Sequence, residues 1–569
     1  MRMVTLKRER ARRAARWAAL LTFSIRSLWG GVAMGQDTDP VGPFHRAVLC
    51  RDPNGRWTIA PARPGASPDL GCQSLDLPIP ASRVRWVGAL TRMDPPGSDR
   101  LVLSGTGHEA GFQPSDASFA APPGPPPRPS ALPLDQGLIP MLSVRPFGVE
   151  ERATLSRMDD AITLHCRAGD RPAGLVLDPG RTRFPDEARF ALRWQVRGNP
   201  GFSAAHAGPQ TDGEVVPLPA EGTLDQPPST QGAAREAPRF VLSCPAHAAS
   251  LTIHDLRLAP LPAAGQKARS AWAWRPNRWR EAPERLITEA RALGADRLFV
   301  SVAIEDGAIT DEARFSDFIG LARAAGITVA VVEGDPGMAL PDGRAIALRR
   351  LGTLAAYQRR SAGDRQLAGV QYDIEPYLLP GFQDDPERIL RGWAVTLDGL
   401  SGAAPPLSLD LVLPFWLPLH RSAGLVLPTI ARVAERITVM AYRTTSTEIL
   451  AAAEPMLAWS SAAMRPLHVA IEAGPVGAET TRTYRPSPTG DLLLLAIAGR
   501  GALALLLRES VALGPADRLY AQERESVVPG SQVSFLGDRE RLEEAVAQLS
   551  RSCAAWPSFS GIALHGIID

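Results

Sequence analysis

The pattern of hydrophobic and polar positions changes character near residue 268. Before it, short alternating runs such as "AGLVLDPG", "ARFALRWQVRG" and "SLTIHDLRLAP" are separated by turn residues, a pattern typical of antiparallel sheets. After it, short apolar runs alternate with amphipathic segments such as "APERLITEARALGA" and "DRERLEEAVAQLSRSC", which indicates βα units around a parallel sheet. We therefore expect an all-β amino-terminal half and an α/β carboxyl-terminal half.

Strand-like apolar runs occur eight times in the carboxyl-terminal half, at 271–276, 297–306, 328–335, 367–376, 407–414, 437–444, 467–474 and 560–569. Eight strands with intervening crossovers predict an α/β fold of the (β/α)8 TIM-barrel type. A doubly wound sheet is disfavoured, because neither a G-x-G-x-x-G turn nor a phosphate loop follows the first run. An insertion, 477–535, follows the seventh run, and its apolar stretch "DLLLLAIAGRGALALLL" is expected to form a buried helix.

Proline and glycine divide the rest of the chain. The segment "FAAPPGPPPRPSALPLDQG" sustains neither a helix nor a central strand, because proline fixes φ and lacks a donor. Residues 119–142 are therefore interpreted as a stiff linker. We expect a small β-rich module over 36–118, a β-sandwich module of jelly-roll type over 143–262, and the barrel over 268–569.

Residues 1–35 combine a basic stretch, an apolar stretch and a small-x-small pattern at Ala33-Met34-Gly35, which resembles a signal peptide. They carry eight basic side chains against one acid, so removing these seven net positive charges takes the formal charge from +2 to −5. The remaining chain has no basic excess that would favour nucleic acid. We expect an exported protein, periplasmic or extracellular, that meets a membrane only through an uncleaved amino-terminal anchor.

Cysteine usage agrees with export. Cys50 and Cys72 lie in one Gly/Pro-rich segment, whereas Cys166 and Cys244 end two strand-like runs. In an oxidising compartment each couple is expected to form a disulfide, which leaves Cys553 over. The chain has no C-x-x-C pair and its histidines are scattered, so neither a metal ion nor another cofactor is expected.

Polar residues stand at the carboxyl-terminal ends of many of the predicted barrel strands. In TIM barrels these ends form the active face. In "GVQYDIEPYLLPGF", Asp373 and Glu375 share one face of their strand because side chains alternate. Two neighbouring carboxylates resist simultaneous ionisation, so one of them keeps a proton and suits a general acid. The other strand-end candidates for catalysis or substrate binding are Trp274, Glu305, Asp410, Trp416, Tyr442, Arg443, Glu472 and His565.

Around Asp373 and Glu375 the chain resembles the chitinase-like, family 18 glycoside hydrolases. Their fourth-strand motif is D-G-x-D-x-D-x-E. The glycine, the last Asp and the Glu of that motif match at Gly369, Asp373 and Glu375. Ala368 and Gln371 stand at the first two Asp positions.

A second motif of the same family is the sixth-strand M-x-Y element, which matches at Met440 and Tyr442. Arg443 stands where an acidic or amide residue commonly follows, and His565 stands on the last strand in place of the family tryptophan. The chain is also similar to exported barrels that share a "DIEPY" strand. The resemblance covers only the barrel and implies action on a polysaccharide or oligosaccharide.

The resemblance implies roles for individual residues. Glu375 protonates the glycosidic oxygen, Asp373 orients a substrate 2-acetamido group and Tyr442 donates to its carbonyl, which requires no enzymic nucleophile. Glu472 leaves a second mechanism open, because glutamates on strands four and seven also resemble the acid and nucleophile of retaining glycosidases. Arg443 either binds an acidic sugar or neutralises Glu375. The competing class is a non-catalytic carbohydrate-binding or assembly protein that uses a degenerate barrel.

Overall fold

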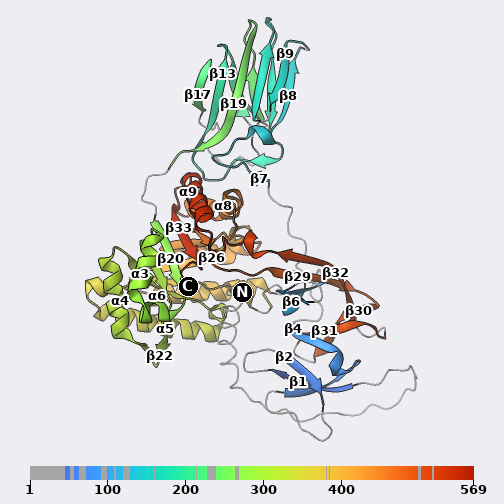
Figure 1. Cartoon of the computed structure of the whole chain (residues 1–569), viewed down its shortest axis with the longest axis vertical. Coiled ribbons are helices and arrows are strands. Elements are labelled where there is room, and N and C mark those ends of the chain that lie inside the picture. Colours follow the sequence, from blue (N-terminus) through green and yellow to red (C-terminus); the bar gives the residue numbers. More distant parts are fainter. Residues whose placement is uncertain are drawn as a thin grey trace.

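The computed structural model describes residues 45–568, except for 52–56, 63–71, 91–98, 108–110, 120–128, 150, 159, 209–210, 213–214, 227–236, 238, 263–267, 380, 383–384, 498–500 and 515–517. The expected signal peptide or anchor, residues 1–35, lies outside the described residues. None of the described helices is both long and apolar enough to cross a membrane. A β-sandwich stands at one end of the molecule, a barrel occupies the middle, and further antiparallel sheets lie at the other end (Figure 1).

A closed barrel of eight parallel strands forms the carboxyl-terminal half, which confirms the predicted fold class. Each strand pairs with the next along the chain, and the last strand pairs with the first. The strands are β20 (Ala268–Ala273), β21 (Arg297–Val300), β24 (Thr328–Glu333), β25 (Val370–Tyr372), β26 (Leu409–Pro414), β27 (Arg436–Met440), β28 (Leu467–Glu472) and β33 (Phe559–His565). The helices around them are α2 (Pro276–Glu281), α3 (Pro283–Ala292), α4 (Glu312–Ala324), α5 (Pro341–Arg360), α6 (Pro386–Ala403), α7 (Leu427–Val433), α8 (Ser446–Ala462) and α9 (Arg539–Cys553).

Side chains fill the barrel lumen, because every second residue of a barrel strand points inward. An apolar cluster that includes Trp272 and Phe299 occupies its middle. The indole Nε1–H of Trp272 donates to Gln371 Oε1 at 2.6 Å, and Gln371 Nε2 donates to Thr438 Oγ1 at 3.3 Å. The polar groups at this depth are therefore paired with one another, and the barrel is a packed core with its chemistry at the ends.

A charged layer closes the amino-terminal end of the lumen. Arg297 and Arg436, the first residues of β21 and β27, both donate to Asp410 Oδ2, at 3.0 and 3.2 Å. His468 lies in the same layer with its Nδ1 3.3 Å from Ser270 Oγ. The prediction that Asp410 lies at the mouth is wrong. Asp410 is the second residue of its strand and pairs in register with Arg436, so it belongs to the opposite end.

Two antiparallel sheets form the sandwich. One has the order β17-β13-β19-β10-β9 and the other the order β15-β14-β18-β11-β8, with β16 paired to β14. Trp194 and Phe240 meet edge to face between the sheets, with ring centroids 6.2 Å apart. The strands are β8 (Ser143–Gly148), β9 (Ala153–Met158), β10 (Ala161–Cys166), β11 (Ala173–Asp178), β13 (Phe190–Gly198), β14 (Ser203–Gly208), β15 (Thr211–Asp212), β16 (Val216–Pro217), β17 (Glu221–Gln226), β18 (Arg239–Ser243) and β19 (Ala249–Pro260).

A buried ion pair joins the sandwich to the barrel. Arg183, in β12 (Thr182–Arg183), donates through Nη1 and Nη2 to both carboxylate oxygens of Glu454 in α8, at 2.8 and 2.6 Å. Such two-point pairing fixes orientation as well as distance. β12 also pairs in parallel with β7 (Ser130–Ala131), which belongs to the second half of the expected linker 119–142. That half contributes buried leucines to the core and is not a free spacer.

Strands from distant parts of the sequence share one seven-stranded sheet (Figure 1). Its order is β4-β31-β30-β32-β29-β5-β6, and the edge strands β4 and β6 also contact each other, so the sheet curls around its own apolar cluster. A three-stranded sheet, β2-β1-β3, covers the outer face. The strands are β1 (His45–Arg51), β2 (Trp57–Pro61), β3 (Cys72–Leu77), β4 (Val84–Leu90), β5 (Leu101–Thr106), β6 (Gln113–Phe119), β29 (Glu479–Pro486), β30 (Thr489–Ile497), β31 (Gly501–Ala512) and β32 (Arg518–Val528).

The expected buried helix in the insertion is wrong, because its apolar stretch forms the antiparallel pair β30 and β31. Successive leucines of these strands alternate between two apolar clusters: Leu492 and Leu494 face the inner one, and Leu493 faces the outer one. A strand that is buried on both faces shows an unbroken apolar run rather than alternation. Such a run cannot be distinguished from a buried helix by its periodicity.

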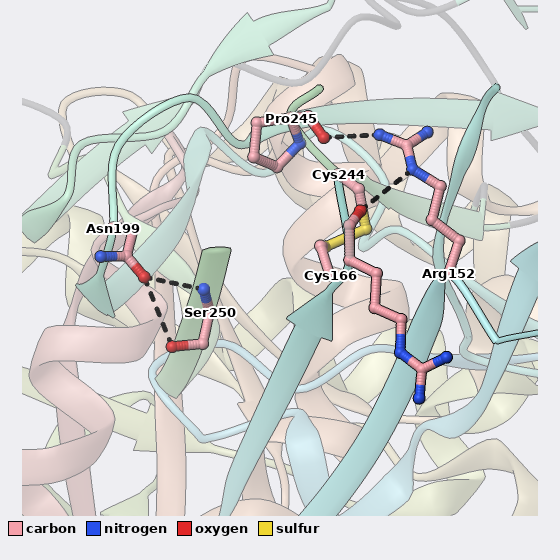
Figure 2. The surroundings of a disulfide bond; sticks show 7 residues. Arg152, Cys166, Asn199, Cys244, Pro245 and Ser250 are labelled. Atoms are coloured by element: carbon pink, nitrogen blue, oxygen red, sulfur yellow. Dashed lines mark hydrogen bonds between the residues drawn. A yellow bond between two sulfur atoms is a disulfide. The ribbon is translucent and has the colours of Figure 1, made fainter. Parts of the chain in front are cut away.

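Both expected disulfides are present. Cys50 pairs with Cys72 between neighbouring strands, and Cys166 pairs with Cys244 across the two sheets of the sandwich. Figure 2 shows Arg152 beside the second bond, where its Nη2 donates to the Pro245 carbonyl at 2.6 Å. This bond therefore ties the two sheets together covalently, beside the hydrogen bond from Arg152 to Pro245.

We predict that replacing both Cys166 and Cys244 by Ser lowers the unfolding free energy of the sandwich. The disulfide joins cysteines with a sequence separation of 78. Closing a loop of that size lowers the entropy of the unfolded chain and so contributes about 4 kcal/mol to the unfolding free energy. Urea unfolding followed by tryptophan fluorescence measures the loss, and the difference from Trp194→Phe isolates the signal of Trp194 in the sandwich. The same midpoint in the double variant and the oxidised wild type would contradict this prediction.

A second prediction concerns His468. Burial, followed by the positive charges of Arg436 and Arg297, lowers the pKa of His468 from its ordinary 6.5 to about 3. Below pH 6.5 the unfolded chain binds a proton at this histidine that the folded chain refuses, so the unfolding free energy decreases as the pH falls toward 3. The wild type should therefore lose up to about 1.4 kcal/mol per pH unit more than His468→Gln over this range.

Urea unfolding at several pH values between 6.5 and 3 tests that difference. Burial raises the pKa of Asp410, which acts in the opposite direction, but Asp410 is present in both proteins. Parallel stability profiles for the wild type and His468→Gln would show that His468 is protonated in the folded state.

Candidate active site

Asp373 and Glu375 follow the end of β25 at the carboxyl-terminal mouth of the barrel. Asp373 N donates to the Glu333 carbonyl at 2.7 Å, which extends the pairing with β24 beyond the last strand residue. The two side chains are only 6% and 5% exposed. Gly369 precedes the strand with φ +144°, and a Cβ there would lie 2.4 Å from Ser408 Oγ. The motif glycine is thus needed for the close approach of β25 and β26.

Tyr377 is a site residue that the sequence analysis missed. It lies in the 3-10 turn Pro376–Leu378, and its hydroxyl donates a hydrogen bond to Glu375 Oε2. Burial raises its pKa well above 10, and the charge of Glu375, the hydrogen bond and the charge of Asp373 add to the shift. Tyr377 therefore remains protonated and is a fixed donor to Glu375.

A hydrogen-bonded chain of three residues lies at the same mouth, on neighbouring strands. Trp274 Nε1–H donates to His565 Nε2 at 2.7 Å, and His565 Nδ1 lies 2.6 Å from Glu472 Oε2. An indole nitrogen can only donate, so His565 Nε2 accepts and the ring proton sits on Nδ1, from which it is donated to the carboxylate. His565 is thereby held as the neutral Nδ1–H tautomer.

Glu472 has both carboxylate oxygens engaged. Its Oε2 binds His565, and its Oε1 accepts from Gly474 N at 2.8 Å. The residue is 2% exposed, and a Cβ on Gly566, whose φ is +74°, would lie 2.4 Å from Oε1. The surrounding backbone therefore encloses this carboxylate closely.

Tyr442 connects the two groups. Its ring centroid lies 5.9 Å from that of His565, and it is close enough to Tyr377 to contribute to the pKa rise of that residue. Beyond Tyr377, the ring of Trp416 stands at 78° with centroids 5.3 Å apart. Half-buried aromatic side chains thus line the mouth on both sides of the carboxylates, a composition typical of small-molecule and sugar sites.

Arg443 follows Tyr442 at the rim of the mouth. Its Nη1 donates to the Tyr442 carbonyl at 2.7 Å, and its guanidinium lies over the ring of Phe415, 5.4 Å from the centroid. The next residue, Thr444, donates to the Ser531 carbonyl at 2.9 Å, which ties the loop to the end of the insertion. Arg443 is therefore held by its own backbone and an aromatic face.

The structure brings together eight of the ten expected catalytic and substrate-binding residues. The exceptions are Asp410, in the charged layer at the other end of the lumen, and Glu305. β21 ends at Val300, and Glu305 lies on the separate hairpin of β22 (Ile304–Glu305) and β23 (Ala308–Ile309), where it is exposed. The apolar run 297–306 is thus a strand followed by a hairpin, which moves Glu305 away from the strand end.

The donor set at the mouth suits proton transfer and hydrogen bonding. Among the described residues, no group of three or more His, Cys, Asp or Glu side chains is arranged to hold a metal ion. The carboxyl group of Glu375 accepts a hydrogen bond from a tyrosine hydroxyl, and Asp373 lies two residues before it. The carboxylate of Glu472 is hydrogen-bonded to a histidine. The arrangement can therefore deliver a proton to a bound group and hold an amide or hydroxyl beside it.

Comparison with known proteins gives structural neighbours only. No protein-family model matches the chain, and no curated protein sequence matches it. A family GH18 chitinase from Cycas revoluta in complex with allosamidin is 14% identical over 52% of this chain and 94% of its own, with a TM-score of 0.30.

Two further neighbours have the same TM-score, 0.30. The class V chitinase from Nicotiana tobaccum is 13% identical over 53% of this chain and 95% of its own. The spore cortex-lytic enzyme SleL of Bacillus cereus is 10% identical over 55% of this chain and 73% of its own. Similarity at this level carries no information about chemistry, which has to come from the residues of this chain.

We predict that His565→Phe removes the hydrogen-bond acceptor of the Trp274 indole N–H and the hydrogen-bond donor to Glu472 Oε2. An unsatisfied buried acceptor costs about 1–3 kcal/mol of stability. In spectra of protein labelled with ¹⁵N-tryptophan, the Trp274 Nε1–H signal, assigned with Trp274→Phe, should shift and exchange faster with solvent. The Trp279 signal, whose N–H donates to the Ser301 carbonyl, is the internal control. An unchanged Trp274 signal would show that the indole does not depend on His565.

Proposed function

We propose that this protein is an exported glycoside hydrolase that cleaves glycosidic bonds in an envelope or extracellular polysaccharide, with Glu375 as the general acid. The observation that carries the proposal is the geometry around Glu375. Its carboxyl group is buried at the barrel mouth, accepts from Tyr377, and shares that mouth with Asp373 and Tyr442. The matching of Gly369, Asp373, Glu375, Met440 and Tyr442 to the two family 18 motifs supports it.

The proposed reaction begins with proton transfer from Glu375. Because Oε2 accepts from Tyr377, the transferred proton sits on Oε1. It passes to the glycosidic oxygen as the bond between that oxygen and the anomeric carbon breaks. The carbonyl oxygen of the sugar 2-acetamido group bonds to the anomeric carbon, with Asp373 holding the amide N–H and Tyr442 the carbonyl side. Water then attacks the anomeric carbon as the bond between that carbon and the acetamido carbonyl oxygen breaks, which restores the acetamido group, and a proton of the water passes to Glu375.

The enclosure of Glu472 favours this assisted mechanism over the two-glutamate one. A nucleophilic carboxylate must approach the anomeric carbon with an oxygen lone pair. Both oxygens of Glu472 already accept hydrogen bonds, from His565 and Gly474, and the residue is 2% exposed. We assign Glu472 the role of holding His565, and through it Trp274, in position at the mouth.

The exported location is part of the proposal. Two disulfides form between strands of the amino-terminal modules, and such bonds persist in oxidising compartments. The signal-like pattern in residues 1–35 points the same way.

A second candidate function is carbohydrate binding without catalysis. It is favoured by Gln371, which stands at the middle Asp position of the motif and is committed to Trp272 and Thr438. The aspartate that the family carries at that position is thus replaced by a neutral amide with a structural role. The first aspartate of the motif is replaced by Ala368. The two functions differ in whether Glu375 transfers a proton.

We predict that Glu375→Gln reduces the release of reducing ends from a susceptible polysaccharide by at least about a hundredfold, because general acid catalysis contributes about that much. Reducing-end assays on polysaccharides with and without 2-acetamido sugars measure the rate. Glu387→Gln, an exposed pair partner of Arg391 on α6, is the matched control and should retain full activity.

Glu472→Gln separates the mechanisms in the same assay. Under the assisted mechanism it retains more activity than Glu375→Gln, because Gln can still accept from His565. A rate as low as that of Glu375→Gln on all substrates would establish the two-glutamate mechanism instead. Sugar binding that survives both substitutions, with no release by the wild type, would establish the non-catalytic function.

A further inference from the structure

Arg443 has no acidic partner in the described part of the chain, in contrast to several arginines that pair with carboxylates of the barrel. Arg350 forms a two-point pair with Glu333, and Arg297 and Arg436 share Asp410. No carboxylate in the described part of the chain forms an ion pair with Arg443, whose contacts are one backbone carbonyl and one aromatic face. The residue is nevertheless half-buried, so its charge is partly removed from water without a protein counter-charge.

The contacts of Arg443 orient its guanidinium and use only one of its N–H donors among the described residues. A guanidinium has five N–H donors, and the Tyr442 carbonyl takes one of them, on Nη1. Stacking over Phe415 restricts the plane of the group. The tie between Thr444 and Ser531 holds the loop. Much of the entropy cost of ordering an arginine has therefore been met before any ligand arrives.

Neutralisation of Glu375, the other role considered for Arg443, receives no support from the geometry. Glu375 Oε2 accepts from Tyr377, and Arg443 forms no ion pair with it. Arg443 instead lies on the rim, directly beside Tyr442 along the chain and against Phe415, the neighbour of Trp416. It is thus next in the chain to Tyr442, which the proposed function assigns to the substrate acetamido group.

We propose that Arg443 binds a carboxylate carried by the sugar polymer, so that the substrate is an acidic polysaccharide; this inference rests on the proposed function. A planar guanidinium pairs with a carboxylate through two parallel hydrogen bonds. One arginine without a protein counter-charge balances the single charge of one carboxylate. A phosphate or sulfate ester presents the same class of acceptor oxygens, so the experiment distinguishes these sources.

The test measures binding by calorimetry in the Glu375→Gln background, so that turnover plays no part. The first probe is a hyaluronan oligosaccharide, in which 2-acetamido sugars alternate with carboxylate sugars. The second is the same oligosaccharide with its carboxyl groups reduced to hydroxymethyl groups, and the third is a sulfated chito-oligosaccharide. Each is titrated into the background protein and into its Arg443→Gln, Arg443→Lys and Arg314→Gln derivatives. Arg314 is exposed on α4 and is the matched control.

The expected result is that the carboxylate probe binds about tenfold or more tightly than the reduced probe. Arg443→Gln should remove this preference, Arg443→Lys should restore part of it because lysine keeps the charge without the fork, and Arg314→Gln should keep it whole. A preference that survives Arg443→Gln would overturn the proposal, as would the absence of binding by the first two probes. Arg443-dependent binding of the sulfated probe alone would overturn the assignment to a carboxylate.

Failure of this inference and failure of the proposed function give different results. An enzyme that releases reducing ends from neutral polymers but shows no carboxylate preference remains a glycoside hydrolase without the Arg443 site. A protein that binds the carboxylate probe through Arg443 but cleaves no polymer retains the site without the hydrolase activity.

Discussion

Closure of the parallel barrel is the constraint on which the rest of this structure depends. Because β33 pairs with both β28 and β20, every strand has two neighbours and every second side chain is forced into one lumen. The lumen must then satisfy each polar group that it receives. It does so in layers, with Asp410 between two arginines at one end and Gln371 between Trp272 and Thr438 in the middle. Asp373 and Glu375, at the carboxyl-terminal mouth, lie directly above these packed layers of the lumen.

The distribution of charge along that column separates structural from candidate chemical groups. Arg297 and Arg436, the first residues of β21 and β27, both form ion pairs with Asp410 at the amino-terminal end of the lumen. A neutral layer follows, and the carboxylates of Asp373 and Glu375 lie beyond it. Glu333 illustrates the same alternation, because Val332 of β24 faces the lumen and the next residue, Glu333, turns outward to Arg350. The parity of a position thus decides whether a strand-end acid faces the surrounding helices or the barrel mouth.

Parity and strand count are the parts of this fold that local sequence patterns predict. All eight barrel strands and the shared face of Asp373 and Glu375 follow from alternation and punctuation. Height along the lumen does not, because it depends on the register between strands, and Asp410 was misplaced for that reason. Tyr377 was missed because a 3-10 turn, and not the strand period, brings it back to Glu375. The pairing of β4 with β31 joins segments about four hundred residues apart, which no local pattern reports.

The hydrogen bonds of Glu472 also determine how His565 is held at the barrel mouth. A neutral imidazole at a barrel mouth would rotate freely between tautomers and orientations unless both nitrogens were bound. Glu472 fixes Nδ1 as the donor, and Trp274 then fixes Nε2 as the acceptor. Protonation of His565 would place two donors face to face at Trp274, so the pair opposes a charged imidazole. Arg443 follows Tyr442 at this mouth with its positive charge, and the carboxylate of Glu472 faces a neutral ring. This arrangement lets Glu375 and an acidic substituent occupy the same mouth without competing for one cation.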